Sequence, residues 1–305
     1  MEEVALPEAF AAFARRGEAW ARFVAGTPRL VRDLLGEWEL RPDGPATHGR
    51  CALVVPVRTA ADAAATLKVG FVEEESEHEA LALQHWHGRG AVTLLRADPR
   101  RGALLLERLT DRDLDQEWDV AACEAVGELC RDLHRPAPPP LRRLSAHAGR
   151  WAAELAGLPR NASLPRRLVE QAAHLAAGFA SDPGTDGRLV HTDLHYENVL
   201  ADHDGRWRAI DPKPLSGDPC FEPAPLRWNR FDELAGDVRD GVRRRFHAVI
   251  DAAGMPEERA RDWVIVRMMV NARWALAEVE AGRTPDGSLR TWLTTCVAVA
   301  KAVQD

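Results

Sequence analysis

Lysine is scarce in this chain of 305 residues, in which 40 residues are lysine or arginine but only Lys68, Lys213 and Lys301 are lysines. The net charge is −7, the pI is about 5.9, and no block of basic residues appears, so we expect no nucleic-acid partner. The preference for arginine looks like a composition bias. Because arginine cannot replace a compact ammonium, the surviving lysines are candidate functional residues.

Long hydrophobic runs are also missing, and none approaches the ~18 residues that a membrane span needs. The first residues, MEEVALPEAF, lack the basic flank and long apolar stretch of a signal peptide. The five cysteines are scattered and form no CxxC pair, so we expect reduced, partly buried thiols. These absences predict a cytoplasmic protein without membrane contact.

The first ~110 residues alternate helical and strand patterns, which predicts a small α+β unit. The expected elements are helical segments at 7–24 and, after Gly26, at 28–38, strands at 51–58 and 64–70, a helix at 73–88 and a hairpin over 92–109.

Beyond residue 109 the patterns become mainly helical. We expect helices at 117–135, 145–157 and 163–180, two short strands in NVLAD and WRAID, and helices from about 232 to the end. The change of pattern predicts an N-terminal nucleotide-binding lobe with leading helices over 1–108. A catalytic and substrate-binding lobe would follow over 109–305.

Ionisable and hydrogen-bonding residues are concentrated in LVHTDLHYENVL, residues 189–200. Asp193 and Asn198 are separated by four residues, and Asp211 ends the later strand WRAID, which is the layout of a kinase catalytic loop. Asp193 would then accept a hydroxyl proton beside the γ-phosphate, while Asn198 and Asp211 supply hard oxygen ligands for Mg²⁺. Lys213 would lie close to that metal.

A zinc site is the alternative interpretation of the same stretch. His191, Asp193 and His195 alternate, so on a strand they would face one way, as in a metallohydrolase. Further ligands are not evident, and Asn198 and Asp211 would be left without a role. We therefore expect His191 to be a structural histidine that bonds the backbone near the loop.

Lys68 lies inside an apolar strand pattern, before an acidic helix. In a kinase this is the position of the lysine that holds the α- and β-phosphates. Its expected partner is Glu79, with Glu75 as the alternative. The segment LLLERL would connect the lobes, and the backbone of Glu107 and Leu109 would hydrogen-bond adenine.

Several segments together resemble the aminoglycoside and hydroxyurea phosphotransferases, the streptomycin 6-kinase group of the aminoglycoside phosphotransferase superfamily. They are VHTDLHYENVL, AIDPKPLSGDPCFEPAPLRWNR, EHEALAL, WHGRGAV and RGALLLERL. The resemblance implies a bilobal protein-kinase-like α+β fold, with a small N-terminal lobe built on an antiparallel sheet and a large, mainly helical C-terminal lobe.

The resemblance also implies ATP with Mg²⁺ and phosphorylation of an aminoglycoside hydroxyl, with streptomycin at its 6-position as the first candidate, which would inactivate the antibiotic. By position, Asp193 is the catalytic base, Asn198 and Asp211 are metal ligands, and Lys68 and Glu79 are the nucleotide pair. A kinase of hydroxyurea or another metabolite is the alternative, followed by a non-catalytic kinase-like binding protein.

Two positions depart from the family pattern, which more usually has glycine at Thr192 and aspartate at Glu222. Threonine costs little if its φ is negative there. The position of Glu222 usually braces the catalytic loop, so its extra methylene is expected to shift that contact. No full glycine-rich loop appears, and the backbone of residues 43–50 is expected to cover the phosphates.

The acceptor is expected to be a cation held by carboxylates of the C-terminal lobe, since the chain is acidic and streptomycin carries two guanidinium groups. The candidate carboxylates are Asp232, Glu233, Glu278 and Glu280. We expect a monomer or a weak homodimer.

Overall fold

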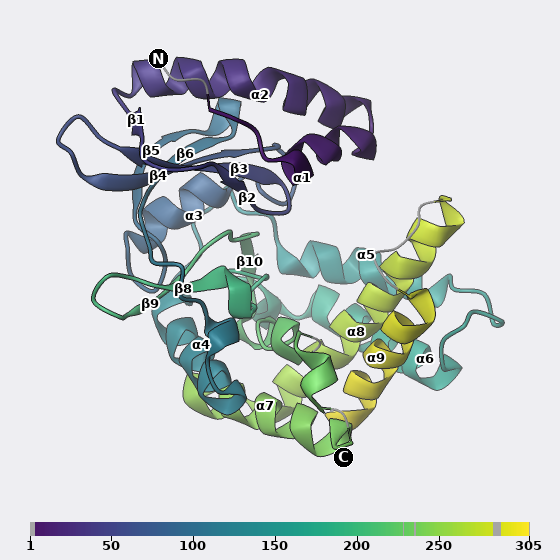
Figure 1. The fold of residues 1–305 in the computed structure, drawn as a ribbon. Coiled ribbons are helices and arrows are strands. Elements are labelled where there is room, and N and C mark those ends of the chain that lie inside the picture. Colours follow the sequence, from purple (N-terminus) through teal and green to yellow (C-terminus); the bar gives the residue numbers. More distant parts are fainter. Residues whose placement is uncertain (1–3, 228, 235, 283–287, 305) are drawn as a thin grey trace. The chain divides into compact units, whose positions relative to one another are not determined.

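The computed structural model describes residues 4–227, 229–234, 236–282 and 288–304. The chain separates into two units, one made of Met1–Thr110 with Asp202–Arg206, the other of Asp111–Ala201 with Trp207–Asp305. Figure 1 labels their helices and strands. The assignment of nucleotide binding to 1–108 and of catalysis to 109–305 stays a prediction.

The first unit is built on a six-stranded antiparallel sheet in the order β1-β3-β4-β6-β5, with β2 paired to β3. Its elements are α1 (Glu8–Ala11), α2 (Glu18–Glu37), β1 (Arg41–Pro42), β2 (Thr47–His48), β3 (Ala52–Arg58), β4 (Ala64–Gly70), α3 (Glu79–Trp86), β5 (Leu94–Asp98) and β6 (Ala103–Glu107).

Strand β4 shows why this unit has a core on one face of its sheet. Ala65, Leu67 and Val69 alternate along the strand and are all buried, as the two-residue period of a strand requires. They pack in one cluster with Val31 and Leu34 of α2. Figure 1 shows α2 along one face of the sheet and α3 along the other.

The expected break at Gly26 is wrong, because α2 runs without interruption through Gly26 and Pro28. The chain instead breaks at Gly17, whose φ of 140° suits glycine. A proline inside a helix removes a backbone hydrogen bond. Packing of the apolar face of α2, including Val31, on the sheet outweighs that loss.

Helix α3 is also shorter than the expected helix over 73–88, since it begins only at Glu79. The residues before it form turns, in which the hydroxyl of Ser76 accepts the amide of Glu73 at 3.2 Å and the Ser76 carbonyl accepts the amide of Glu79 at 3.0 Å. Local side-chain bonds of this kind compete with the helix. The other expected strands and the hairpin of this unit are present.

The second unit is mainly helical, with two small antiparallel sheets. Its helices are α4 (Asp119–Leu133), α5 (Leu144–Ala156), α6 (Arg166–Ser181), α7 (Val238–Ala253), α8 (Glu257–Glu280) and α9 (Leu289–Ala302). The strands are β7 (Arg188–Val190) paired with β10 (Leu215–Gly217), and β8 (Val199–Ala201) paired with β9 (Trp207–Ala209). The β7–β10 pair was not expected from the sequence.

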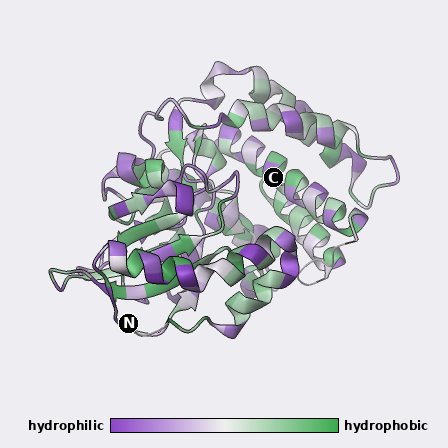
Figure 2. Cartoon of the chain, turned by 90° about the horizontal axis from the view of Figure 1, so that it is seen from above, coloured by the Kyte–Doolittle hydropathy of each residue, from purple (hydrophilic) through white to green (hydrophobic). Residues whose placement is uncertain are grey.

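Aromatic packing organises the core of this unit. The rings of Phe179 in α6 and Trp263 in α8 stack with centroids 3.8 Å apart, and Trp263 Nε1 donates to Asp218 at 2.7 Å. Figure 2 shows helices banded in purple and green, as expected for helices with one buried face. Among the residues that the structure describes, no helix is long and apolar enough to cross a membrane.

Candidate active site

Asp193 lies in the loop between β7 and β8, and Asn198 lies at the end of the same loop. The side-chain amide of Asn198 donates to the Asp193 carbonyl at 2.9 Å and lies 3.4 Å from Asp193 Oδ2. The Asn198 carbonyl accepts the amide of Ile210 at 2.9 Å, one residue before Asp211. The β8–β9 hairpin therefore returns Asp211 to the loop that carries the other two residues.

His191 is buried at the start of this loop and uses both ring nitrogens within the protein. Nε2 bonds the Ile210 carbonyl at 2.9 Å, and Nδ1 accepts the amide of Asp193 at 3.3 Å. Burial lowers the pKa of His191 and favours the neutral imidazole. With both nitrogens engaged, the structural interpretation of this histidine is confirmed, and the described residues offer no cluster of ligands that would support the zinc alternative.

Glu222 supports the loop between β7 and β8 through hydrogen bonds to its backbone. Its side chain is fully buried, and its carboxylate accepts the amide of His191 and, at 3.0 Å, the amide of Thr192. Burial opposes ionisation, but the nearby imidazole of His134 and the His191 amide outweigh it and lower the pKa of Glu222. The longer side chain therefore still reaches the catalytic loop.

The φ of Thr192 is not negative, so the condition under which threonine causes little backbone strain here is not met. Its φ is 68°, in the left-handed region that β-branched residues avoid. The residue is buried, and its hydroxyl donates to the Lys213 carbonyl at 2.7 Å. The expectation of an unstrained threonine is thus corrected, because the contacts around it hold this backbone conformation.

Asp211 has a positive φ as well, 55°, and its carboxylate accepts the ammonium of Lys213 at 2.8 Å. A cation therefore lies against the carboxylate that was predicted to bind metal. The amide nitrogen of Asn198 donates to Asp193, so the side-chain oxygen of Asn198 is the atom to which the predicted metal-binding role would fall. One carboxylate and one amide oxygen are donors that suit Mg²⁺.

In the first unit, Lys68 and Glu79 form a buried ion pair. The ammonium lies 2.6 Å from Glu79 Oε1, and the two side chains are 13% and 8% exposed. Lys68 is on the face of β4 opposite the residues that pack on α2, and Glu79 opens α3. The structure joins Lys68 to Glu79, and the nucleotide-binding role of the pair stays a prediction.

The predicted adenine contacts lie where β6 ends. The amide of Glu107 donates to the Thr93 carbonyl at 3.0 Å and its carboxylate accepts the Thr93 amide at 2.7 Å, so only its carbonyl suits adenine. Leu109 follows in the connecting segment, and its role also stays a prediction. Arg108 was not singled out from the sequence; its guanidinium donates to Asp43 at 2.6 Å and to the Ala65 carbonyl at 3.1 Å.

The candidate substrate carboxylates Glu233 and Glu280 already pair with arginine. Glu233 accepts the guanidinium of Arg230 at 2.8 Å, and Glu280 accepts that of Arg273 at 3.2 Å. Asp232 is exposed beside Glu233, and Glu278 is half-buried on α8. Their substrate-binding roles stay predictions.

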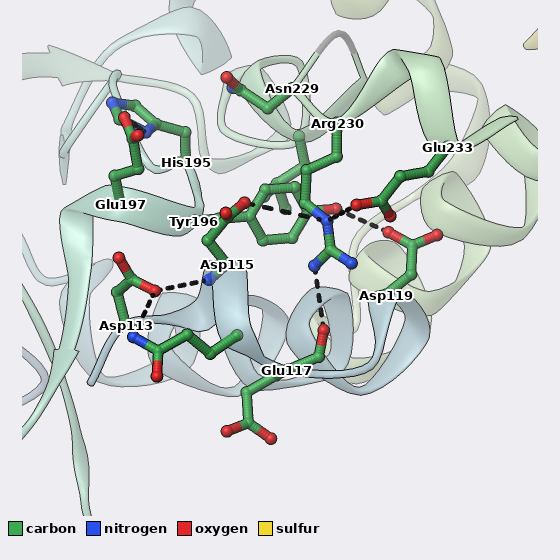
Figure 3. A network of polar contacts seen from close by, with 12 residues as sticks. Asp113, Asp115, Glu117, Asp119, His195, Tyr196, Glu197, Asn229, Arg230 and Glu233 are labelled. Carbon is green, nitrogen blue, oxygen red and sulfur yellow. Dashed lines mark hydrogen bonds and ion pairs between the residues drawn. The ribbon is translucent and has the colours of Figure 1, made fainter.

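Figure 3 shows a polar network around the aromatic ring of Tyr196, within the second unit. Arg230 lies 5.1 Å from the centroid of that ring and donates to the Glu117 carbonyl at 3.0 Å. The Tyr196 hydroxyl donates to Asp119 at 3.0 Å, and burial raises the pKa of this hydroxyl. Sequence reasoning missed this network, although the single tyrosine of the chain marked its centre.

Comparison with known proteins finds related kinases over most of the chain. A model of the family described as aminoglycoside/hydroxyurea antibiotic resistance kinase matches residues 37–279. The chain is 37% identical over 294 residues to a streptomycin 6-kinase of Streptomyces glaucescens, covering 92% of this chain and 94% of that protein. It is 42% identical over 276 residues to a hydroxyurea phosphotransferase of Kitasatospora aureofaciens, covering 87% and 77%.

The fold is also that of solved kinases. A choline/ethanolamine kinase family protein from Mesorhizobium loti matches with a TM-score of 0.62 at 17% identity, covering 90% of this chain and 95% of that one. This match confirms the protein-kinase-like α+β fold expected from the sequence. The chain belongs to the aminoglycoside/hydroxyurea antibiotic resistance kinases, a family of phosphotransferases that act on small molecules.

Proposed function

We propose that this kinase transfers the γ-phosphoryl group of ATP to a hydroxyl of an aminoglycoside, with streptomycin at its 6-position as the first candidate. The observation that carries the proposal is the joining of Asp193 and Asn198 by hydrogen bonds, with Asp211 brought back by the β8–β9 hairpin. The similarity to streptomycin 6-kinase over 92% of the chain supports the choice of substrate.

Asp193 is the proposed general base. The acceptor hydroxyl oxygen forms a bond to the γ-phosphorus while the bond from that phosphorus to the β–γ bridging oxygen breaks, and ADP leaves. The hydroxyl proton passes to the Asp193 carboxylate. The side-chain amide of Asn198 donates to the backbone carbonyl of Asp193 and approaches its carboxylate. Asn198 would therefore keep this base in a fixed orientation.

Asp211 and the side-chain oxygen of Asn198 are the proposed ligands for Mg²⁺, since both supply hard oxygen atoms. When bound, the metal neutralises charge that develops on the phosphate oxygens. The ammonium of Lys213 lies 2.8 Å from the Asp211 carboxylate. The chain's own part is to hold these donors in place through the bonds to Ile210 and His191.

Lys68 is proposed to hold the α- and β-phosphates of the nucleotide, and Glu79 to orient its ammonium. Because the pair is mostly buried at 2.6 Å, the ammonium is held in one place. The Glu107 carbonyl and the Leu109 amide are proposed to bond adenine, since the Glu107 amide is already used.

The acceptor is proposed to be bound through its cationic groups. Asp232 and Glu233 are the first candidates, because these adjacent acids are both exposed, whereas Glu278 is half-buried. Streptomycin offers two guanidinium groups, which carboxylates bind bidentately. Glu278 and Glu280 are the second candidates.

The test is a coupled assay of ADP release with streptomycin and other aminoglycosides, with the phosphorylated product identified by mass spectrometry. If exposed carboxylates bind the drug, raising the ionic strength should raise the KM for streptomycin by screening. The KM for ATP should move less. Absence of streptomycin phosphorylation at every salt concentration would refute this substrate while leaving a small-molecule kinase.

Hydroxyurea is the second candidate acceptor, because a relative named hydroxyurea phosphotransferase is 42% identical to this chain. Hydroxyurea carries no charge, so its KM should not respond to ionic strength. Faster turnover of hydroxyurea than of any aminoglycoside, with a salt-independent KM, would favour this second function.

A further inference from the structure

Thr192 combines a costly backbone conformation with a specific side-chain contact. Its φ of 68° lies in the left-handed region, where a branched Cβ crowds the backbone. Residues held in such conformations cluster at functional sites, where the surrounding structure maintains them. A glycine would take this conformation without strain, so the threonine side chain has to contribute something else.

The contribution is a link between two loops that carry different proposed roles. The hydroxyl of Thr192 donates to the Lys213 carbonyl at 2.7 Å. One residue earlier, the His191 carbonyl accepts the amide of Lys213 at 3.0 Å. Two adjacent residues of the catalytic loop are therefore bonded to both backbone polar groups of one residue in the segment after Asp211.

Each end of this link is next to a proposed functional carboxylate. Thr192 directly precedes Asp193, and Lys213 follows Asp211 by two residues and donates its ammonium to that carboxylate at 2.8 Å. The amide of Thr192 is fixed as well, because it donates to the buried Glu222 at 3.0 Å. Rotation at Thr192 is thus blocked from both its backbone and its side chain.

We propose that Thr192 is a positioning residue for phosphoryl transfer, whose hydroxyl bond to the Lys213 carbonyl sets the placement of Asp193 relative to Asp211. The proposal rests on the proposed function, in which Asp193 is the base and Asp211 a metal ligand. The hydroxyl acts through these two residues and does not touch the reacting atoms.

Three substitutions separate the hydroxyl from the backbone conformation. Thr192→Val keeps the shape and the strain but removes the donor, Thr192→Gly removes the donor and relieves the strain, and Thr192→Ser keeps the donor. Thr294→Val in α9 is the matched control, because the Thr294 hydroxyl donates to the Arg290 carbonyl at 2.8 Å, on an exposed helix face.

We expect kcat of Thr192→Val and of Thr192→Gly to fall by about tenfold or more, because small misplacements of reacting groups are costly. The KM for the acceptor should change little. Thr192→Ser should stay within about threefold of wild type, and Thr192→Gly should keep its Tm, since glycine suits this φ. A lower kcat without a lower Tm is an effect that a purely structural threonine would not produce.

Calorimetric titration with ADP, with and without Mg²⁺, gives a readout that does not need turnover. Thr192→Val should weaken ADP binding in the presence of Mg²⁺ by about threefold or more, and leave metal-free binding unchanged. Failure of the wild type to phosphorylate any acceptor would contradict the proposed function, and this titration would still decide the role of Thr192.

Three results would overturn the proposal. The first is wild-type kcat and Mg²⁺-dependent ADP affinity in both Thr192→Val and Thr192→Gly. The second is a wild-type kcat in Thr192→Gly together with a reduced kcat in Thr192→Ser. That result would assign the effect to backbone strain and not to the hydroxyl. The third is an equal loss of kcat and of Mg²⁺-dependent ADP affinity in Thr294→Val, which would show that the effect is not specific to Thr192.

Discussion

The fully buried guanidinium of Arg245 donates to the carboxylate of Asp119 at 2.8 Å, although 126 residues separate them in the chain. Arg245 also donates to the carbonyls of Asn229 at 2.6 Å and Arg230 at 3.1 Å. The pair therefore ties the start of α4 to the segment just before the candidate substrate carboxylate Glu233.

Replacing Asp119 by alanine should lower the free energy of unfolding by about 3 kcal/mol, because it leaves the Arg245 charge buried without its carboxylate. The partial exposure of Asp119 places this at the lower end of the range for buried pairs. Glu170→Ala, which removes the exposed pair with Arg166, should cost about 1 kcal/mol or less. Urea unfolding of both variants measures the difference, and equal losses would contradict a structural role of the buried pair.

Asp193→Asn should retain nucleotide binding and lose turnover. A positioned base contributes roughly 10²–10⁴-fold, and the loss should appear in kcat more than in KM. Asp251→Asn on the exposed face of α7 is the control and should behave as wild type. Steady-state kinetics and ADP calorimetry measure both effects, and a nearly fully active Asp193→Asn would remove this residue from the mechanism.

Lys68→Arg should impair the enzyme although the charge is kept. The planar guanidinium is larger than the ammonium and cannot keep the 2.6 Å contact with Glu79 in the same buried position. We expect a higher KM for ATP and a lower kcat. Lys301→Arg on the exposed surface of α9 is the matched substitution and should change neither constant. Unchanged kinetics in Lys68→Arg would leave this lysine without a nucleotide role.

Asp211→Ala should weaken Mg²⁺-dependent nucleotide binding more than Asn198→Ala does. A carboxylate stabilises the metal more than a neutral amide oxygen does. The loss in Asp211→Ala should exceed the roughly 10–100-fold that loss of an outer-shell partner costs. Calorimetry with ADP at several Mg²⁺ concentrations gives the order. Metal-independent affinity that is equal in the two variants would count against both as ligands.

The stability of the metal-free protein should fall as the pH drops below about 6.5. Burial lowers the pKa of His191 from its ordinary value of 6.5, so the unfolded chain binds this proton first and the stability present above 6.5 is lost in acid. The slope from this group is at most about 1.4 kcal/mol per pH unit. Glu222, whose pKa is also lowered, adds a second loss below about 4.5.

Urea unfolding at about six pH values between 7.5 and 5 tests this assignment. It measures how steeply the free energy of unfolding falls as the pH drops, which is the acid limb of the stability curve. His191→Gln should flatten that limb, whereas His203→Gln in an exposed turn should leave it as in the wild type. An acid limb that is equally steep in His191→Gln and in the wild type would show that other groups cause it.

Local patterns in the sequence were sufficient for the parts of the site that depend on short spacing. The alternation in β4 placed Lys68 opposite the residues that face the core, because side chains on a strand alternate between its faces. The spacing from Asp193 to Asn198, followed by a tight hairpin to Asp211, likewise brings these residues together over a short stretch of chain. The sequence also determined the family, because its motifs extend over most of the chain.

The tertiary structure alone decided which distant groups support that site. Glu222 lies 31 residues from His191 and Arg245 lies 126 from Asp119, and no local pattern relates such pairs. The three-residue strands β7 and β10 are too short for a periodic signal. The positive φ of Thr192 follows from bonds to Glu222 and Lys213 on other segments, which exist only when the chain is packed.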